Sequence, residues 1–238
     1  MATITALSII AKASRILQDI ANARWSTSDL LDVLNDGQRA IVIAKPSANI
    51  TTAPIPLVAG TLQTLPANGI VIEEITRNMG TNGLTPGPVI LPMQKAVLDI
   101  SFPGWHQDNP DLTVVYYCYN TKTPKIFYVY PPQPAGTQQK VEALMSANPV
   151  DVPSISSVIA LDDIYAIPLE EYVLYRAFLR DAEASTLDYQ RAKDHFQNFM
   201  ALVGLKVKSE GAESPVMPVS GQVAEQVASA AKVQQGQQ

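Results

Sequence analysis

Apolar residues recur at every third or fourth position in two stretches at the start of the chain. The first stretch predicts a helix over residues 4–23, with an apolar face formed by Leu7, Ile10, Leu17 and Ile20. The second predicts a helix over residues 29–45, with an apolar face formed by Leu31, Leu34, Ile41 and Val42. We expect the two helices to pair as a hairpin with Trp25 at its corner.

Local signals mark both ends of the second helix. Ser26, Thr27 or Ser28 can accept hydrogen bonds from the first free backbone N–H groups, and Asp29 favours the positive end of the helix dipole. Pro46 ends the helix because it pushes the residue before it out of the helical region. An N-terminal helical hairpin is therefore predicted over residues 1–48.

Proline separates this hairpin from the middle of the chain. All but two of the 18 prolines lie between Pro46 and Pro168, and proline is disfavoured in helix interiors and central strands. The pattern there predicts a tight hairpin of residues 55–57 and 61–65, a strand at 70–77, a loop at 78–88, a short helix at 93–100, and strands at 113–119, 125–130 and 139–147. The last three are expected to share one sheet. Residues 49–168 are thus predicted to be a β-rich insertion.

Helical spacing returns after Pro168. A helix is expected from about Leu169, a second cap at Ser185-Thr186, and a second helix with an apolar stripe formed by Tyr189, Phe196, Phe199, Met200 and Val203. Residues 169–205 would complete a small antiparallel bundle. Residues 206–238 contain no aromatic side chain and are predicted to be an extended tail, disordered when free. The expected fold class is therefore α+β: a helical bundle with a β-rich insertion and a flexible C-terminal tail.

Composition limits the function. Only 16% of residues are charged, which fits either surface covered by neighbours or a chain rich in proline and alanine. The net charge of −5 argues against a basic nucleic-acid binder but suits a channel wall along which DNA slides. Cys118, the single cysteine, lies among tyrosines and is expected to be a small buried apolar residue. We find no signal peptide and no membrane-spanning segment.

The sequence contains no constellation that an enzyme or a metal site requires. The two histidines, His106 and His195, are far apart, and we expect the first to pack or turn and the second to be a solvated helix position. The pairs Asp162-Asp163 and Glu170-Glu171 could form a carboxylate site, but adjacent carboxylates are more often solvated or at helix starts. The prediction is a protein without catalytic residues, metal or cofactor.

Two surface features remain open between a structural and a functional role. Lys122 and Lys125 flank the turn at 120–124, where they could contact DNA or an acidic tail-side partner, or could be solvated residues that discourage edge pairing. Four tyrosines of the expected sheet could form a stacking platform for single-stranded nucleic acid, or could lie in the sheet core and a subunit interface. We favour the second role for these residues, which are Tyr116, Tyr117, Tyr128 and Tyr130.

Five blocks of sequence carry a resemblance to one family. The run at residues 25–48 (WSTSDLLDVLNDGQRAIVIAKPSA) is followed in order by residues 60–66 (GTLQTLP), 103–106 (PGWH), 123–132 (TPKIFYVYPP) and 169–178 (LEEYVLYRAF). Together they resemble the head-to-tail adaptor (connector) proteins of short-tailed bacteriophages over roughly residues 1–205. The motif residues are Trp25, Arg39, Pro46, Trp105, Phe127, Tyr130, Tyr172 and Arg176.

The resemblance implies a structural protein of the virion neck, assembled in the host cytoplasm. It implies a homo-oligomeric ring on the dodecameric portal protein, contact with tail nozzle or tail tube proteins, and a channel through which DNA passes. We expect the tail of the chain to order on the portal or a neighbouring copy through Val216, Met217, Val219, Val223 and Val227. The alternative is a nozzle-side neck or tail component that does not contact the portal.

Overall fold

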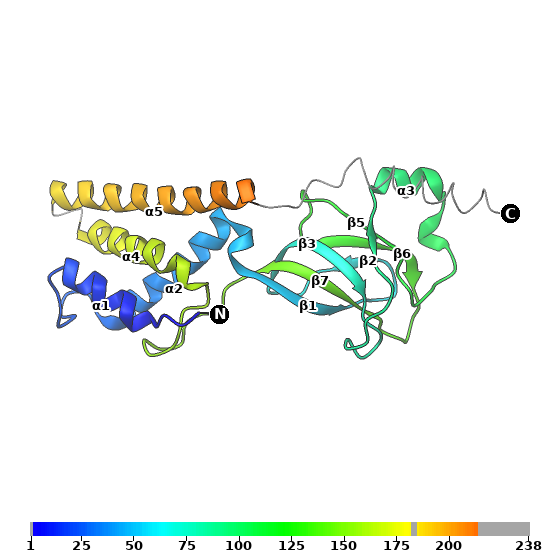
Figure 1. The fold of residues 1–238 in the computed structure, drawn as a ribbon, viewed down its shortest axis with the longest axis horizontal. Helices are drawn as coiled ribbons and strands as arrows, with labels where there is room; N and C mark the ends of the chain where they lie inside the picture. The colour runs from blue at the N-terminus through cyan, green and yellow to red at the C-terminus, as the bar shows by residue number, and fades with distance from the viewer. Residues whose placement is uncertain (1, 182–184, 214–238) are drawn as a thin grey trace.

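The chain folds into two bodies that lie end to end, a helical bundle and a β domain (Figure 1). The computed structural model describes residues 2–181 and 185–213. The chain leaves the bundle after its second helix and returns to it before its third, so the β domain is an insertion in the bundle. The predicted α+β class and its arrangement are therefore confirmed.

The bundle consists of α1 (Ala6–Ile16), α2 (Thr27–Ala44), α4 (Ala166–Asp181) and α5 (Thr186–Glu213). Helix α4 lies between the others and packs against each of them. Their shared core includes Ile9, Leu34, Leu169, Val173 and Phe199. The spacing of these apolar residues is what gives each helix one buried face.

The first helix is shorter than its apolar pattern predicts. It ends at Ile16, because Gln18 and Asn22 adopt positive φ angles of 57° and 52° that no right-handed helix can contain. The Asp19 carboxylate then accepts hydrogen bonds from the backbone N–H groups of residues 23–25. The predicted apolar face is wrong at two positions, since Ile20 is 77% exposed and Leu7 is 47% exposed.

The predicted cap and the predicted stop of the second helix are confirmed, although the helix runs over Thr27–Ala44 rather than residues 29–45. The Ser26 hydroxyl accepts a hydrogen bond of 3.1 Å from the Asp29 N–H group at the start of α2. Lys45 has an extended backbone (φ −143°), and Pro46 begins a short 3₁₀ turn, Pro46–Asn49, that leads into the β domain. Trp25 is buried in the bundle core, as expected for the corner of the hairpin.

The C-terminal helices differ from prediction at their ends. Helix α4 begins at Ala166 rather than Leu169. Pro168 fits in its first turn, because backbone N–H groups in a first turn have no partner within the helix and proline has no N–H group to lose. Helix α5 follows Ser185, whose hydroxyl accepts from the Asp188 N–H group at 3.3 Å. It runs to Glu213, past the boundary predicted at residue 205. The tail residues Val216, Met217, Val219, Val223 and Val227 lie outside the described residues.

The β domain is a sandwich of two small sheets. One sheet has the strand order β1 (Ile50–Pro56), β7 (Lys140–Ala147), β3 (Gly69–Asn78), and the other β2 (Gly60–Thr64), β6 (Ile126–Gln133), β5 (Tyr116–Tyr119), β4 (Leu91–Pro92). All pairs are antiparallel except β4 with β5. Side chains from both inner faces form one core, which includes Ile75, Phe127, Val129 and Val141.

Two predicted strand pairings are wrong. Residues 55–57 and 61–65 do not pair as a hairpin, since β1 pairs with β7 and β2 pairs with β6 in the other sheet. The turn between them is still tight, because the Gln63 side chain bonds both the N–H and the C=O of Val58. Strand β7 belongs with β1 and β3 rather than with β5 and β6.

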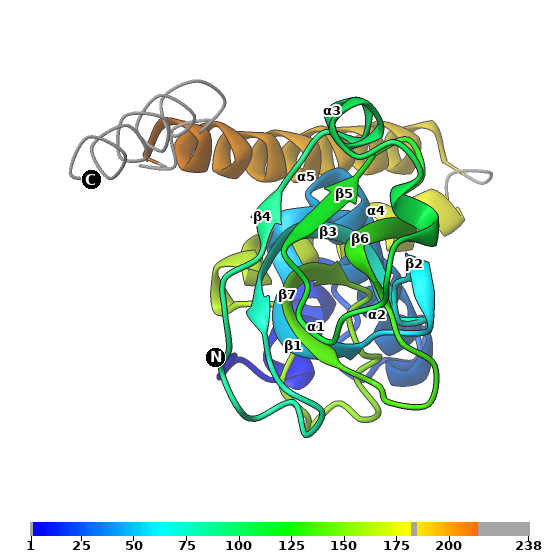
Figure 2. The ribbon, with the colours of Figure 1, turned by 90° about the vertical axis from the view of Figure 1, so that its right-hand side faces the viewer.

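A third layer covers the outer face of the second sheet. Helix α3 (Lys95–Ser101) and a turn at Trp105–Gln107 lie over β5 and β6 (Figure 2). Leu98, Trp105 and Cys118 are buried together there against Tyr128 and Tyr130. The short helix predicted at 93–100 is therefore confirmed, and so is the burial of Cys118.

Candidate functional site: the Asn35–Arg39 segment and the assembly surfaces

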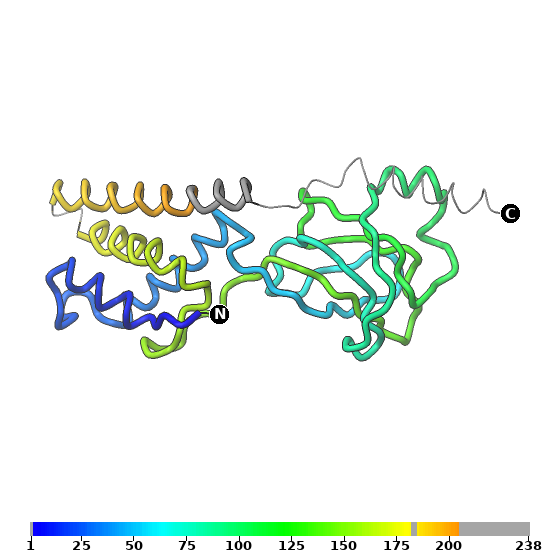
Figure 3. Tube along the Cα trace, in the orientation of Figure 1, coloured from blue at the N-terminus to red at the C-terminus, as the bar shows by residue number. Residues whose placement is uncertain are grey.

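The two chain segments that join the bodies are fastened to each other. Figure 3 follows them, one from α2 into β1 and one from β7 back to the bundle. The Ser146 hydroxyl donates to the Pro46 carbonyl at 2.6 Å, and the Asn49 side-chain amide donates to the Ala147 carbonyl at 2.8 Å. Pro46 thus ends a helix and also supplies an acceptor that fixes the β domain to the bundle.

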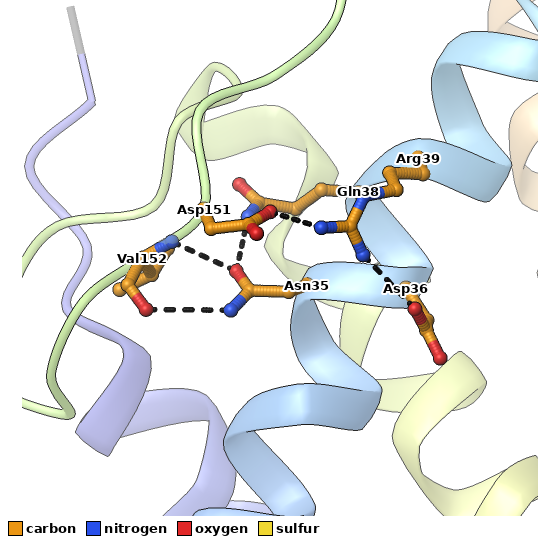
Figure 4. A network of polar contacts seen from close by, with 6 residues as sticks. All are labelled: Asn35, Asp36, Gln38, Arg39, Asp151 and Val152. Atoms are coloured by element: carbon orange, nitrogen blue, oxygen red, sulfur yellow. Dashed lines mark hydrogen bonds and ion pairs between the residues drawn. The ribbon is translucent and has the colours of Figure 1, made fainter.

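Asn35, in α2, holds the returning segment by its backbone (Figure 4). Its Oδ1 accepts a hydrogen bond of 2.8 Å from the N–H group of Val152, and its Nδ2 donates to the carbonyl of the same residue at 3.3 Å. Both residues are buried. A side-chain amide suits this position because it offers a donor and an acceptor at once, whereas a carboxylate offers acceptors only.

Gln38 extends the same network one turn further along α2. Its Nε2 donates to Asn35 Oδ1 at 3.1 Å, and its Oε1 accepts from the N–H groups of Ala160 and Leu161 at 2.7 and 3.4 Å. Gln38 is 1% exposed. Two buried side-chain amides of α2 therefore bond backbone groups at both ends of the segment 152–161. These backbone groups lie in a loop and need such partners, because they have none in a helix or sheet.

The other residues of the segment complete the attachment. The Arg39 guanidinium pairs with Asp36 at 3.0 Å and also with Asp151, next to the residue that Asn35 holds (Figure 4). Gly37 lets α4 approach, since a Cβ atom at this position would lie 2.9 Å from Cδ1 of the buried Tyr172. The run Asn-Asp-Gly-Gln-Arg therefore attaches the returning segment to α2 and lets α4 pack closely against it.

The remaining motif residues of the bundle have distinct positions. Trp25 is buried with the Arg24 guanidinium 4.8 Å from its ring centroid. Tyr172 is buried edge-on to Phe199, with ring centroids 5.2 Å apart. Arg176, in contrast, is exposed on α4, so it is a surface residue and contributes little to the core.

Trp105 fastens the outer layer of the β domain. Its Nε1–H donates to Asp99 in α3 at 2.8 Å, and this hydrogen bond, followed by that from Lys95, holds the pKa of Asp99 below its usual range. His106 stacks on Trp105 with centroids 3.7 Å apart, and its Nδ1 lies 2.7 Å from the Thr61 hydroxyl. The expected packing role of His106 is confirmed.

The tyrosines and phenylalanine of the hairpin serve the sandwich. Phe127 is fully buried between the sheets. Tyr130 stacks on Phe102 with centroids 5.1 Å apart, and its hydroxyl donates to Asp108. Tyr117 is buried and Tyr116 is half-buried against Tyr130. The predicted place in the sheet core is therefore confirmed for Tyr117, whereas Tyr116, Tyr128 and Tyr130 are half-buried and their place in a subunit interface stays a prediction.

The two candidate lysines differ. Lys122 is exposed at the tip of the turn between β5 and β6. The Lys125 ammonium donates to the carbonyl of Gly69 at the start of β3, so it links the two sheets. Lys122 is therefore the stronger candidate for contact with a partner or with DNA, and Lys125 has a structural role that its sequence position does not reveal.

The carboxylate pairs form no common site. Asp162 caps a short turn, and Asp163 accepts from the hydroxyl and N–H of Thr3, which lower its pKa. Glu171 Oε2 lies 2.8 Å from Nδ1 of His195, whereas burial raises the pKa of Glu170. The expectation that His195 is solvated is wrong: it is half-buried, paired with an acid and stacked on the ring of Phe178.

No reactive or metal-binding centre emerges from the part of the chain that the structure describes. None of its His, Cys, Asp and Glu residues gather in groups of three or more that could hold a metal ion. A hollow of about 490 Å³ beside α3 is lined by Lys95, Tyr119 and Tyr128, with Cys118 at its wall. Burial raises the pKa of the Cys118 thiol, which disfavours the nucleophilic thiolate. Among the described residues, no helix combines the length and the apolar content that crossing a membrane requires.

Of the Asn35–Arg39 segment, the sequence analysis predicts only Arg39 as a motif residue. The roles of Asn35, Gly37 and Gln38 become visible in the structure. A signal was present: two amides three residues apart lie on the face that carries Leu34 and Ile41. A polar side chain at a core position needs a partner. The pattern could have shown that a partner exists, but not that it is the segment 152–161.

Comparison with known proteins agrees with this architecture. The model of the SU10 adaptor protein family matches residues 4–220, which include the bundle, the β domain and the Asn35–Arg39 segment. No curated protein matches the chain. The resemblance seen in the five sequence blocks is therefore confirmed over most of the chain. The chain belongs to the SU10 adaptor protein family, the members of which are bacteriophage head-to-tail adaptors and structural proteins of the virion.

Proposed function

We propose that copies of this protein form a ring in the neck of the virion, between the portal protein and the tail nozzle or tail tube. The observation that carries the proposal is the family match over residues 4–220. The ring is expected to follow the symmetry of the dodecameric portal and to assemble on it in the host cytoplasm. Its work is mechanical attachment, with no chemical step.

The shape of the molecule supports a two-sided adaptor. The bundle and the β domain have separate hydrophobic cores at opposite ends of an elongated chain. Each end can therefore bind a different neighbour without disturbing the other. The hydrogen bonds of Pro46, Asn49 and the Asn35–Gln38 network hold the two connecting segments in place. A force applied to one body is therefore transmitted to the other through these side chain–backbone hydrogen bonds as well as through the chain.

Two groups of residues are candidates for the contacts. Lys122, exposed in the turn between β5 and β6, is proposed to face the tail-side partner or the DNA channel. The portal or a neighbouring copy is proposed to bind the apolar residues beyond α5, which are Val216, Met217, Val219, Val223 and Val227. Each such contact is weak alone, but many copies on one ring add up to firm attachment.

The charge of the chain supports a passive channel. With a net charge of −5, the chain as a whole repels DNA phosphates. DNA would then pass through the ring without sequence-specific contact. Low affinity for duplex DNA at physiological salt is expected of the free protein.

Truncation tests the proposal. A chain ending at Glu213 keeps every described helix and removes the five apolar tail residues. We expect the full chain to sediment with purified portal rings and the truncated chain to remain in the supernatant. Unchanged binding of the truncated chain would remove the tail residues from the proposal. Absence of binding by the full chain, with the portal ring intact, would favour the nozzle-side component.

A further inference from the structure

An apolar strip runs along the exposed seam between α4 and α5. On α5 it consists of Tyr189, Phe196 and Met200, which are 52%, 40% and 47% exposed. Their spacing of seven and four residues places them on one helical face. On α4 the strip continues with Leu179 and Tyr175, whose ring centroid lies 4.9 Å from that of Phe196. The strip therefore joins side chains of two helices into one surface.

Helix α5 has little other support in the bundle. Within the described residues it packs almost entirely against α4, whereas α4 also contacts α1 and α2 (Figure 1). Its buried side chains Ala192, Phe199 and Val203 face α4. The strip lies beside this buried face, so a further apolar partner would extend a packing layer that is already present.

A second apolar surface lies on a different side of the bundle. A hollow of about 350 Å³ between α1 and the start of α2 is lined largely by Leu7, Ile10, Ala11, Ile20 and Ile155. Ile20 is 77% exposed because the tight turn after α1 directs it outward. No described residue of α4 or α5 lines this hollow, and α1 and α5 lie on opposite sides of α4 (Figures 1 and 2).

We infer that neighbouring copies of this chain pack the α4–α5 strip of one copy into the α1 hollow of the next. A symmetric pairing of two strips would leave both hollows exposed to water. Pairing strip with hollow covers both surfaces on every copy and repeats from copy to copy until the ring closes. The inference rests on the proposed ring and names the surfaces that form it.

The size of the strip explains why a template is needed. From Tyr189 to Met200 α5 rises by about 16 Å, and two adjacent helices are about 20 Å wide. The strip therefore offers a footprint of about 300 Å², against about 800 Å² per partner in stable complexes. One contact cannot hold two free copies together. Copies already bound to a portal are at high effective concentration, and the same contact then forms.

Crosslinking tests the inference. The double variant Leu7→Cys/Phe196→Cys places one thiol at the hollow and one on the strip, both at partly exposed positions. Cys118 is 3% exposed and its thiol pKa is raised, so it reacts slowly. With a short bis-maleimide we expect a ladder of multimers on portal rings and monomers without them. The control Val97→Cys/Phe196→Cys uses a comparably exposed site on α3 and should give no ladder.

The outcomes separate the inference from the function it rests on. Binding to the portal is measured by sedimentation before crosslinking. Portal-bound protein that gives no ladder with the 7/196 pair, or the same ladder with the control pair, would overturn the strip-to-hollow contact and leave the ring intact. Wild-type protein that does not bind the portal would contradict the ring and the inference together.

A single charge offers a second readout. Tyr189→Glu places a carboxylate in the strip at a position that is 52% exposed, so the fold is expected to be retained. We expect about tenfold weaker filling of portal rings by this variant, typical of an interface tyrosine. Gln190→Glu, the neighbouring exposed residue on α5, should fill them like the wild type. Equal filling by both variants would contradict the inference.

Discussion

Replacing Asn35 with alanine tests the role of the Asn35–Arg39 segment most sharply. The change removes the acceptor of the Val152 N–H group and of Gln38 Nε2, and the donor to the Val152 carbonyl. An unpaired buried donor costs about 1–3 kcal/mol, and two donors are left. Alanine returns at most about 0.7 kcal/mol through its higher helix propensity. The bundle should therefore lose about 1–5 kcal/mol of unfolding free energy.

Asp36→Ala is the matched control. Asp36 is the next residue on α2, its side chain is 49% exposed, and it makes one ion pair, with Arg39. A surface pair of this kind contributes about 0–1 kcal/mol. Both variants are compared with the wild type by urea unfolding, which is monitored by the helical circular dichroism signal. The free energies are compared when the dependence of unfolding free energy on urea concentration is the same for all three proteins.

Hydrogen exchange locates the effect. In Asn35→Ala the amides of Val152 and Ala160 should exchange faster than in the wild type, while amides of the β7 strand keep their protection. A loss for Asn35→Ala no larger than that for Asp36→Ala, with Val152 still protected, would refute the view that Asn35 holds the returning segment.

Three further changes test the packing and the charges of the bundle. Gly37→Ala should destabilise by about 1–2 kcal/mol, because crowding against Tyr172 at 2.9 Å outweighs the helix propensity gained; thermal unfolding measures it, and a gain in stability would contradict the contact. The hydroxyl and N–H of Thr3 lower the pKa of Asp163, so its contribution is present above about pH 4 and is lost as the pH falls below that; Asp163→Asn should differ from the wild type at pH 7 and converge with it in acid, and a pH-independent difference would argue against this. Burial raises the pKa of Glu170, so Glu170→Gln should stabilise at pH 7 but not at pH 3, and a loss at pH 7 would show that its charge is favourable.

Elements with local signals could be predicted from the sequence. The hydroxyl cap of Ser26 and the ring of Pro46 fix the limits of α2 through contacts with their immediate neighbours. Strand partners could not be predicted in this way. The sequence of β7 fits either sheet, and its place is decided by packing against β1 and β3 at sequence separations of more than 60 residues.

The candidate residues divide along the same line. The positions of Trp25, Trp105 and Phe127 in the core follow from their size and apolar character. The bond of Lys125 to Gly69 and the pairing of His195 with Glu171 depend on which elements lie opposite each other. These partners are far away in the sequence, so the sequence alone predicts contact with solvent or with a ligand for Lys125 and His195.

The mass of the portal–adaptor complex shows whether copies of this protein form a ring on the portal. Purified protein would be mixed with the portal protein of the same phage and the products weighed by native mass spectrometry. We predict a monomer when the protein is alone, and one discrete complex with one copy per portal subunit when both are present. A portal ring that carries no copies, while the protein binds tail proteins instead, would contradict it.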